Sequence, residues 1–163
     1  MPTTDFPALF APGFRALTLT ELHRIAVEHP RFRLSRTRAP IMKSLWTLAA
    51  CITQQGVGNE LWVDGSFLTE KIDPQDVDLI LVLPENFESN ASAEQLGVWN
   101  WWDTSEPKGM FQCDTYSLPR LPLSDPDYLL YLRLELYWKK WFGTSRQGRG
   151  KGIGRILLPD GCV

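Results

Sequence analysis

The sequence predicts a mixed α/β (α+β) fold in which helices flank a short mixed β-sheet. Segments with helical periodicity alternate along the chain with short apolar segments typical of buried strands. The chain has 163 residues, of which 44% are hydrophobic, so a single domain over residues 1–163 can bury a sizeable core. The sequence contains no internal repeat, which gives no reason to expect a second unit.

The N-terminal part of the chain predicts an arm and a helix. Residues 1–17 are rich in proline and aromatic residues without a period, so we expect an extended arm laid across the domain and no core element there. Thr18 and Glu21 have the spacing of a capping box, which predicts the start of a helix. Pro30 should stop this helix near His29.

Two further helices are expected. One follows Thr37 and ends near Gln55, because apolar residues repeat there at helical spacing, at positions Ile41, Leu45, Leu48 and Ile52. The other begins at Ser124-Asp125-Pro126 and runs to Phe142. Residues 84–109 predict no clear element.

Four short apolar segments predict strands, at residues 61–64, 77–83, 110–116 and 151–158. The segment 77–83, VDLILVL, is apolar on both faces after its first carboxylate. This pattern is typical of a central strand covered by helices on both sides.

The stretch LWVDGSFLTEKIDPQDVDLILVL carries the most informative polar pattern. Asp76 and Asp78 are two residues apart at the start of a strand, so their side chains should point to the same face. Two carboxylates at one point repel unless a cation lies between them, and oxygen ligands favour Mg²⁺ or Mn²⁺. The turn at Gly65-Ser66 lets the backbone approach phosphate oxygens closely. Asp114, on another predicted strand, could complete a site of three carboxylates.

Two other features allow a functional and a structural interpretation. The segment that holds Arg146, Arg149 and Lys151 is basic without acidic residues. It could bind a triphosphate or a nucleic-acid backbone, or form a solvated loop. Asp64 precedes the Gly-Ser turn, and we expect it to brace that turn.

Composition excludes several classes of protein. The net charge of -2 gives no global basic field for nucleic acid. The cysteines Cys51, Cys113 and Cys162 lack the spacing of a zinc site or a disulfide framework. No apolar run approaches the roughly 20 residues that span a bilayer, so we expect a cytoplasmic protein without a membrane partner.

The pattern of Gly-Ser, a loop, Asp-x-Asp and a later Asp resembles the signature of the nucleotidyltransferase superfamily, which includes DNA polymerase β and the minimal nucleotidyltransferases. Over most of its length the chain is also similar to a bacterial and phage group of nucleotidyltransferase-like proteins, in which LWVDGSFLTEKIDPQDVDL follows a long helix and a KGI strand closes the domain. The loop departs from the superfamily pattern, since Phe67-Leu68-Thr69-Glu70 lacks the usual glycine and Gln75 replaces a serine.

The resemblance implies a nucleotidyltransferase-like fold and a metal-dependent transfer of a nucleotide from a nucleoside triphosphate to a hydroxyl on protein, RNA or a small molecule. It implies that Gly65 and Ser66 hold the triphosphate and that three aspartates bind Mg²⁺ or Mn²⁺, with catalytic roles for Asp76, Asp78 and Asp114. Arg146, Arg149 and Lys151 could neutralise charge. The alternative is an inactive binding or regulatory module on the same fold, antitoxin-like or a phage or defence partner, whose protein interface would include the Trp-rich segment 99–102.

Overall fold

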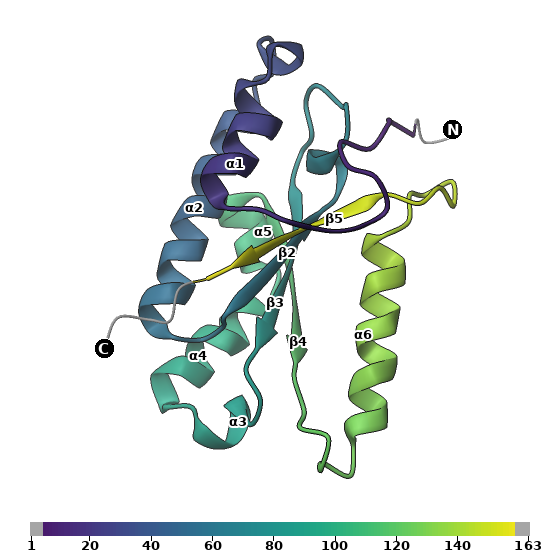
Figure 1. Ribbon diagram of the computed structural model, residues 1–163. Helices are drawn as coiled ribbons and strands as arrows, with labels where there is room; N and C mark the ends of the chain where they lie inside the picture. The colour runs from purple at the N-terminus through teal and green to yellow at the C-terminus, as the bar shows by residue number, and fades with distance from the viewer. Residues whose placement is uncertain (1–4, 159–163) are drawn as a thin grey trace.

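The computed structural model describes residues 5–158, so residues 1–4 of the predicted arm and Cys162 lie outside the described residues. A single mixed sheet forms its centre, with strand order β1-β5-β2-β3-β4 (Figure 1). β2 is antiparallel to both of its neighbours, whereas β3 and β4 are parallel, as are β1 and β5. The strands are β1 Gly13–Ala16, β2 Glu60–Asp64, β3 Val77–Leu83, β4 Cys113–Pro119 and β5 Gly152–Leu157.

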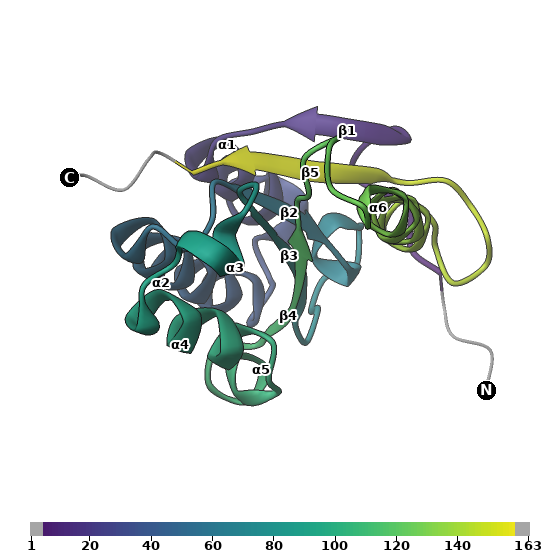
Figure 2. The same ribbon diagram turned by 90° about the horizontal axis from the view of Figure 1, so that it is seen from below.

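Helices cover both faces of this sheet. The α-helices are α1 Leu19–His23, α2 Arg38–Gln55, α3 Phe87–Asn90, α4 Ala93–Trp102, α5 Glu106–Phe111 and α6 Tyr128–Phe142. Seen from below, α2, α4 and α5 lie on one face and α6 lies on the other (Figure 2). Two buried apolar clusters result, a large one that includes the α2 stripe and a smaller one that includes Trp62 and Phe142. The predicted class, a mixed sheet flanked by helices, is confirmed.

Most of the predicted helical signals act as expected. Thr18 and Glu21 form the capping box of α1, which continues as a short π-helical turn to Glu28 before Pro30. Gly56 ends α2 in the left-handed conformation, one residue after Gln55. β3 is buried along almost its whole length, as its apolar sequence predicts for a central strand.

Two predictions about the elements are wrong. Part of the expected arm belongs to the sheet and the core. Gly13–Ala16 forms a strand paired with β5, and Phe10 and Leu17 are buried in the core. The strand expected at 110–116 begins only at Cys113, since the preceding residues form α5 with Pro107 in its first turn. Local propensity could not show where that short helix gives way to the strand.

Residues 84–109 form three short helices, and their tryptophans pack inward. Trp102 is fully buried and donates its indole N–H to the carbonyl of Tyr116, while Trp99 and Trp101 pack against the core. A protein interface in this segment stays a prediction. Within residues 5–158 no helix is both long and apolar enough to cross a membrane.

Candidate functional site

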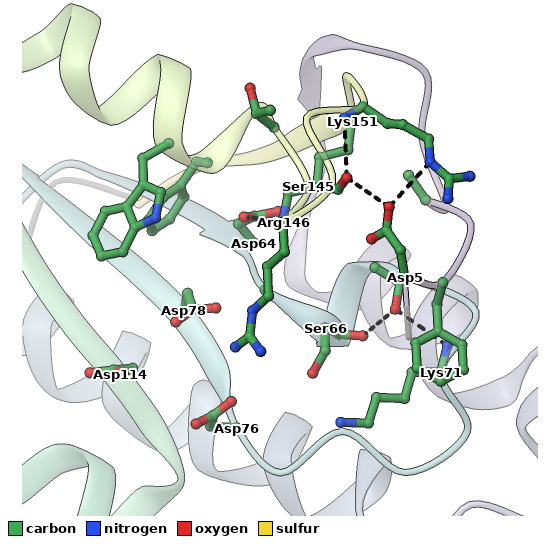
Figure 3. Close-up of a pocket in the computed structure, with 18 of the residues that line it drawn as sticks. Asp5, Asp64, Ser66, Lys71, Asp76, Asp78, Asp114, Ser145, Arg146 and Lys151 are labelled. Atoms are coloured by element: carbon green, nitrogen blue, oxygen red, sulfur yellow. Dashed lines mark hydrogen bonds and ion pairs between the residues drawn. The ribbon is translucent and has the colours of Figure 1, made fainter. Parts of the chain in front are cut away.

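A pocket of about 730 Å³ opens where β2 ends and β3 and β4 begin. The Gly65-Ser66 turn, the starts of β3 and β4, the arm, α5 and the segment from Trp141 to Lys151 all contribute to its wall. The turn, the predicted aspartates and the predicted basic residues therefore surround one cavity (Figure 3). The lining includes every predicted site residue: Gly65, Ser66, Asp76, Asp78, Asp114, Arg146, Arg149 and Lys151.

Strand register aligns three carboxylates in a row across the sheet. Asp64 at the end of β2 is paired with Asp78 on β3, and Asp78 is paired with Asp114 on β4. Residues in register on neighbouring strands point to the same face, so their side chains lie side by side. Asp76 lies two residues before Asp78, and Figure 3 shows it below that row. The three aspartates in register and Asp76 beside them, Asp64, Asp76, Asp78 and Asp114, are called the acidic row below.

Gly65 has the one backbone conformation in this site that only glycine adopts easily. Its φ is 82° and its ψ is -165°, a region disfavoured for residues with a Cβ. A Cβ at this position would lie 2.2 Å from Asp78 Oδ2. The glycine thus lets the turn pass directly over the Asp78 carboxylate.

A buried arginine fixes the loop that follows this turn. Arg38 of α2 is fully buried and donates hydrogen bonds to the carbonyl oxygens of Phe67, Thr69 and Lys71. Its guanidinium also lies over the Phe32 ring at 3.7 Å, and burial lowers its pKa to about 10. Because one side chain binds three carbonyls of the loop, the Gly-Ser turn is held at the end of β2.

Lys151 and Asp64 form a nearly enclosed ion pair at one end of the acidic row. Lys151 Nζ lies 2.6 Å from Asp64 Oδ2, and their side chains are only 12% and 4% exposed. Burial raises the pKa of Asp64 to about 7, although Lys151 acts in the opposite direction. Asp64 Oδ1 is buried without a hydrogen-bond partner. One oxygen of this carboxylate therefore still lacks a donor or cation.

Lys108 of α5 joins two aspartates at the other end of the row. Its Nζ lies 2.5 Å from Asp114 Oδ2 and 3.1 Å from Asp76 Oδ2, and nearly half of its side chain is exposed. The hydrogen bond to Asp114 is the main cause of a raised pKa for Lys108. Between the two ends, burial and the charges of Asp76 and Asp114 raise the pKa of Asp78 to about 6. The four carboxylates of the acidic row are thus contacted by only two lysines, Lys108 and Lys151, among these ion pairs.

Two carboxylates of the acidic row, those of Asp76 and Asp114, are placed to share one cation. Among residues 5–158, no three acidic, histidine or cysteine side chains are close enough together to hold a metal ion. Asp76 and Asp114 nevertheless point an oxygen each at one shared cation, the Lys108 ammonium. Mg²⁺ in phosphoryl-transfer sites is commonly held by one or two carboxylates together with substrate phosphates and water. Asp76 and Asp114 could supply two such carboxylates in place of their contacts with Lys108.

Basic side chains occupy the opposite wall. Arg146 extends across the pocket toward Asp76 and Asp78 (Figure 3). Arg149 lies 3.3 Å from Asp5 of the arm, and Asp5 also accepts a hydrogen bond from Ser145. Figure 3 shows Lys71 pointing into the same cavity. Acidic and basic walls therefore face each other across a gap lined by the Gly-Ser turn.

Sequence reasoning missed several residues of the pocket. Lys108 gave no signal, because the start of β4 was placed too early and α5 was not predicted. Asp64 was assigned to the turn, although the alternation that separates it from Val63 could have put it beside Asp78 once β2 and β3 were paired. Asp5 reaches the pocket only through tertiary packing, whereas Tyr116 could have been found from its position two residues after Asp114 on the same strand.

Comparison with known proteins gives a family without an assigned activity. No curated protein and no solved structure shows significant similarity to the chain. A family model matches residues 2–157, nearly the whole sequence. By that match the chain belongs to the family of unknown function DUF6932.

Proposed function

We propose that this pocket binds a nucleoside triphosphate with Mg²⁺ or Mn²⁺ and transfers its nucleotidyl group to an acceptor hydroxyl. One observation carries the proposal: Asp64, Asp78 and Asp114 lie in register beside the Gly65-Ser66 turn, and with Asp76 they face a basic wall across one cavity. Carboxylates supply cation ligands, and the turn and basic side chains supply phosphate ligands. The order of Gly-Ser, paired aspartates and a third aspartate on the adjacent parallel strand supports a nucleotidyltransferase-like fold.

Each part of the pocket has a distinct task in this proposal. Gly65 lets the turn pass over Asp78 at the edge of the cavity, and Ser66 offers a hydroxyl and its backbone N–H to a phosphate. Asp76 and Asp114 would hold the divalent ion together with phosphate oxygens, with Asp78 beside them adding negative charge. The ion would neutralise charge on the phosphates and the leaving group. Arg146 and Arg149 neutralise the remaining charge, and Lys151, which also lines the pocket, offsets the charge of Asp64.

The chemical step needs a proton acceptor. The acceptor oxygen forms a bond to the α-phosphorus, and the bond from that phosphorus to the oxygen bridging to the β-phosphorus breaks. Pyrophosphate leaves with the electron pair of that bond, and the hydroxyl proton passes to Asp114. Asp114 can take it only after Lys108, 2.5 Å away, releases the carboxylate.

The test is transfer of label from each α-labelled nucleoside triphosphate, with Mg²⁺ or Mn²⁺, alone and with cell extract, which supplies protein, RNA and small-molecule acceptors. Asp76→Ala/Asp78→Ala should abolish transfer. Glu85→Ala/Glu88→Ala is the matched control, since it removes two exposed acidic groups away from the pocket. Absence of both triphosphate binding and label transfer by the wild-type protein would reject the proposal.

The Lys108 contact favours a second candidate, an inactive nucleotide-binding module such as an antitoxin-like or phage-encoded partner protein. An ammonium between Asp76 and Asp114 supplies positive charge at the point where a metal would bind. In that case triphosphate binding would persist in a metal chelator, and no label would be transferred. The enzyme requires the opposite results in both measurements.

A further inference from the structure

One corner of the pocket is aromatic. Tyr116 follows Asp114 by two residues on β4, so both side chains point to the same face of the strand. Trp141 and Phe142 end α6, immediately before the segment that carries Arg146, Arg149 and Lys151. The aromatic corner therefore adjoins both the acidic row and the basic wall.

Trp141 is held in place and yet remains half exposed. Its ring stacks on Trp138 at a centroid distance of 5.3 Å and an interplanar angle of 23°. Tyr116 packs edge-on against it at 5.5 Å. Despite these contacts Trp141 is 51% exposed, and it lines the pocket. An indole already fixed by neighbouring rings loses little conformational entropy when a ligand covers its free side.

We infer that Trp141 forms the platform on which the base of the bound nucleotide stacks. This inference rests on the proposed function, because it assumes that the pocket holds a nucleoside triphosphate. Such a ligand has one flat aromatic end and one strongly anionic end, and the pocket offers an aromatic corner beside cationic and carboxylate walls. Stacking tolerates every base, since each has a π-face. Purines, with the larger ring system, should bind more tightly than pyrimidines.

The experiment compares a ligand that has a base with one that lacks it. Affinities of ATP and of inorganic tripolyphosphate, each with Mg²⁺, are measured by calorimetry for the wild-type protein, Trp141→Ala and Trp141→Phe. Trp141→Ala should weaken ATP binding about tenfold or more and leave tripolyphosphate within about twofold, whereas Trp141→Phe should retain most of the ATP affinity. Trp46→Ala, which removes a partly exposed indole of α2 outside the pocket, should change neither ligand.

The outcomes separate this inference from the proposal beneath it. If wild-type protein binds both ligands and Trp141→Ala leaves their ratio unchanged, the stacking platform is wrong while the triphosphate site stands. If Trp141→Ala weakens both ligands equally, the indole supports the pocket as a whole and the platform is again wrong. If neither ligand binds to the wild-type protein, the proposed function fails and the platform fails with it. Intact tripolyphosphate binding shows that a variant is folded.

Discussion

A lysine forms an ion pair at each end of the acidic row, and the two ion pairs differ in how far their side chains are exposed to solvent. Lys151 and Asp64 are nearly enclosed, with side chains 12% and 4% exposed, whereas Lys108 is 48% exposed and its partners Asp76 and Asp114 are each 28% exposed. A buried charge that loses its partner is costly, while an exposed pair exchanges with water and ions at little cost. We therefore expect the Lys151 end to contribute more to stability, and we propose the Lys108 end as the point at which a cation enters.

Lys151→Met tests the enclosed end and should have the largest effect on stability. It leaves Asp64 buried without its cation, so we expect a loss of about 3 kcal/mol in the free energy of unfolding. Urea denaturation at pH 8 measures it. Lys139→Met is the control, because Lys139 pairs with Glu135 at the surface of α6 and should cost less than about 1 kcal/mol. Equal losses in the two variants would show that the enclosure of the Lys151–Asp64 pair adds nothing to its effect on stability.

Gly65→Ala tests whether the turn must pass over Asp78. The new Cβ would clash with the carboxylate and require an unfavourable φ, so we expect a loss of about 2 kcal/mol in stability together with a loss of triphosphate binding. Gly148→Ala is a matched control, since Gly148 also has a positive φ, of 77°, but nothing lies near its missing Cβ. It should cost about 1 kcal/mol. A smaller loss of stability for Gly65→Ala than for Gly148→Ala would show that the close approach of Gly65 to Asp78 does not affect stability.

The raised pKa of Asp78, in the middle of the acidic row, predicts that the stability of the fold depends on pH. Folding raises the pKa of Asp78 from 3.8 to about 6, so the folded state holds a proton between these values that the unfolded state releases. Stability should therefore fall as pH rises from about 4 to 7, and Asp78→Asn should lack this part of the fall. We expect the wild-type protein to lose about 2 kcal/mol relative to Asp78→Asn across that window, measured by urea denaturation at each pH. A difference that stays constant with pH would contradict the raised pKa.

Lys108→Ala tests the open end and should have the smallest effect on stability, below about 1 kcal/mol. Removal of the ammonium frees Asp76 and Asp114, so we expect Mn²⁺ affinity to rise about tenfold, which corresponds to about 1.4 kcal/mol. Calorimetric titration measures the affinity, with Lys139→Ala as the control. Unchanged or weaker Mn²⁺ binding would mean that Lys108 does not compete with a cation.

Much of the fold was predictable, because its signals are local. The capping box at Thr18, the α2 stripe and the apolar sequence of β3 each determine structure within a few residues. The strand formed by Gly13–Ala16 was not predictable, since its stability depends on β5, which lies far along the chain. The same is true of α5, whose six residues carry little helical signal of their own.

In the candidate site, too, some residues could be predicted from the sequence and others could not. Asp76 and Asp78 were grouped by strand periodicity, and the structure places Asp114 in register beside Asp78. The partners of these residues could not be read from the sequence, because Lys108, Asp64 and Trp141 reach the pocket through strand register and helix packing. A sequence pattern can show which carboxylates lie close together, but it does not show which cationic side chains pair with them.

The most direct test of the central claim is a Mn²⁺ titration followed by electron paramagnetic resonance, with and without a non-hydrolysable nucleoside triphosphate. The acidic row predicts a saturable Mn²⁺ site that tightens in the presence of the triphosphate. Asp76→Asn/Asp114→Asn should lose that site, while Glu85→Ala/Glu88→Ala should keep it. Mn²⁺ binding that is equal in these two variants, or that does not respond to the triphosphate, would contradict the claim that the open end of the row is a metal and triphosphate site.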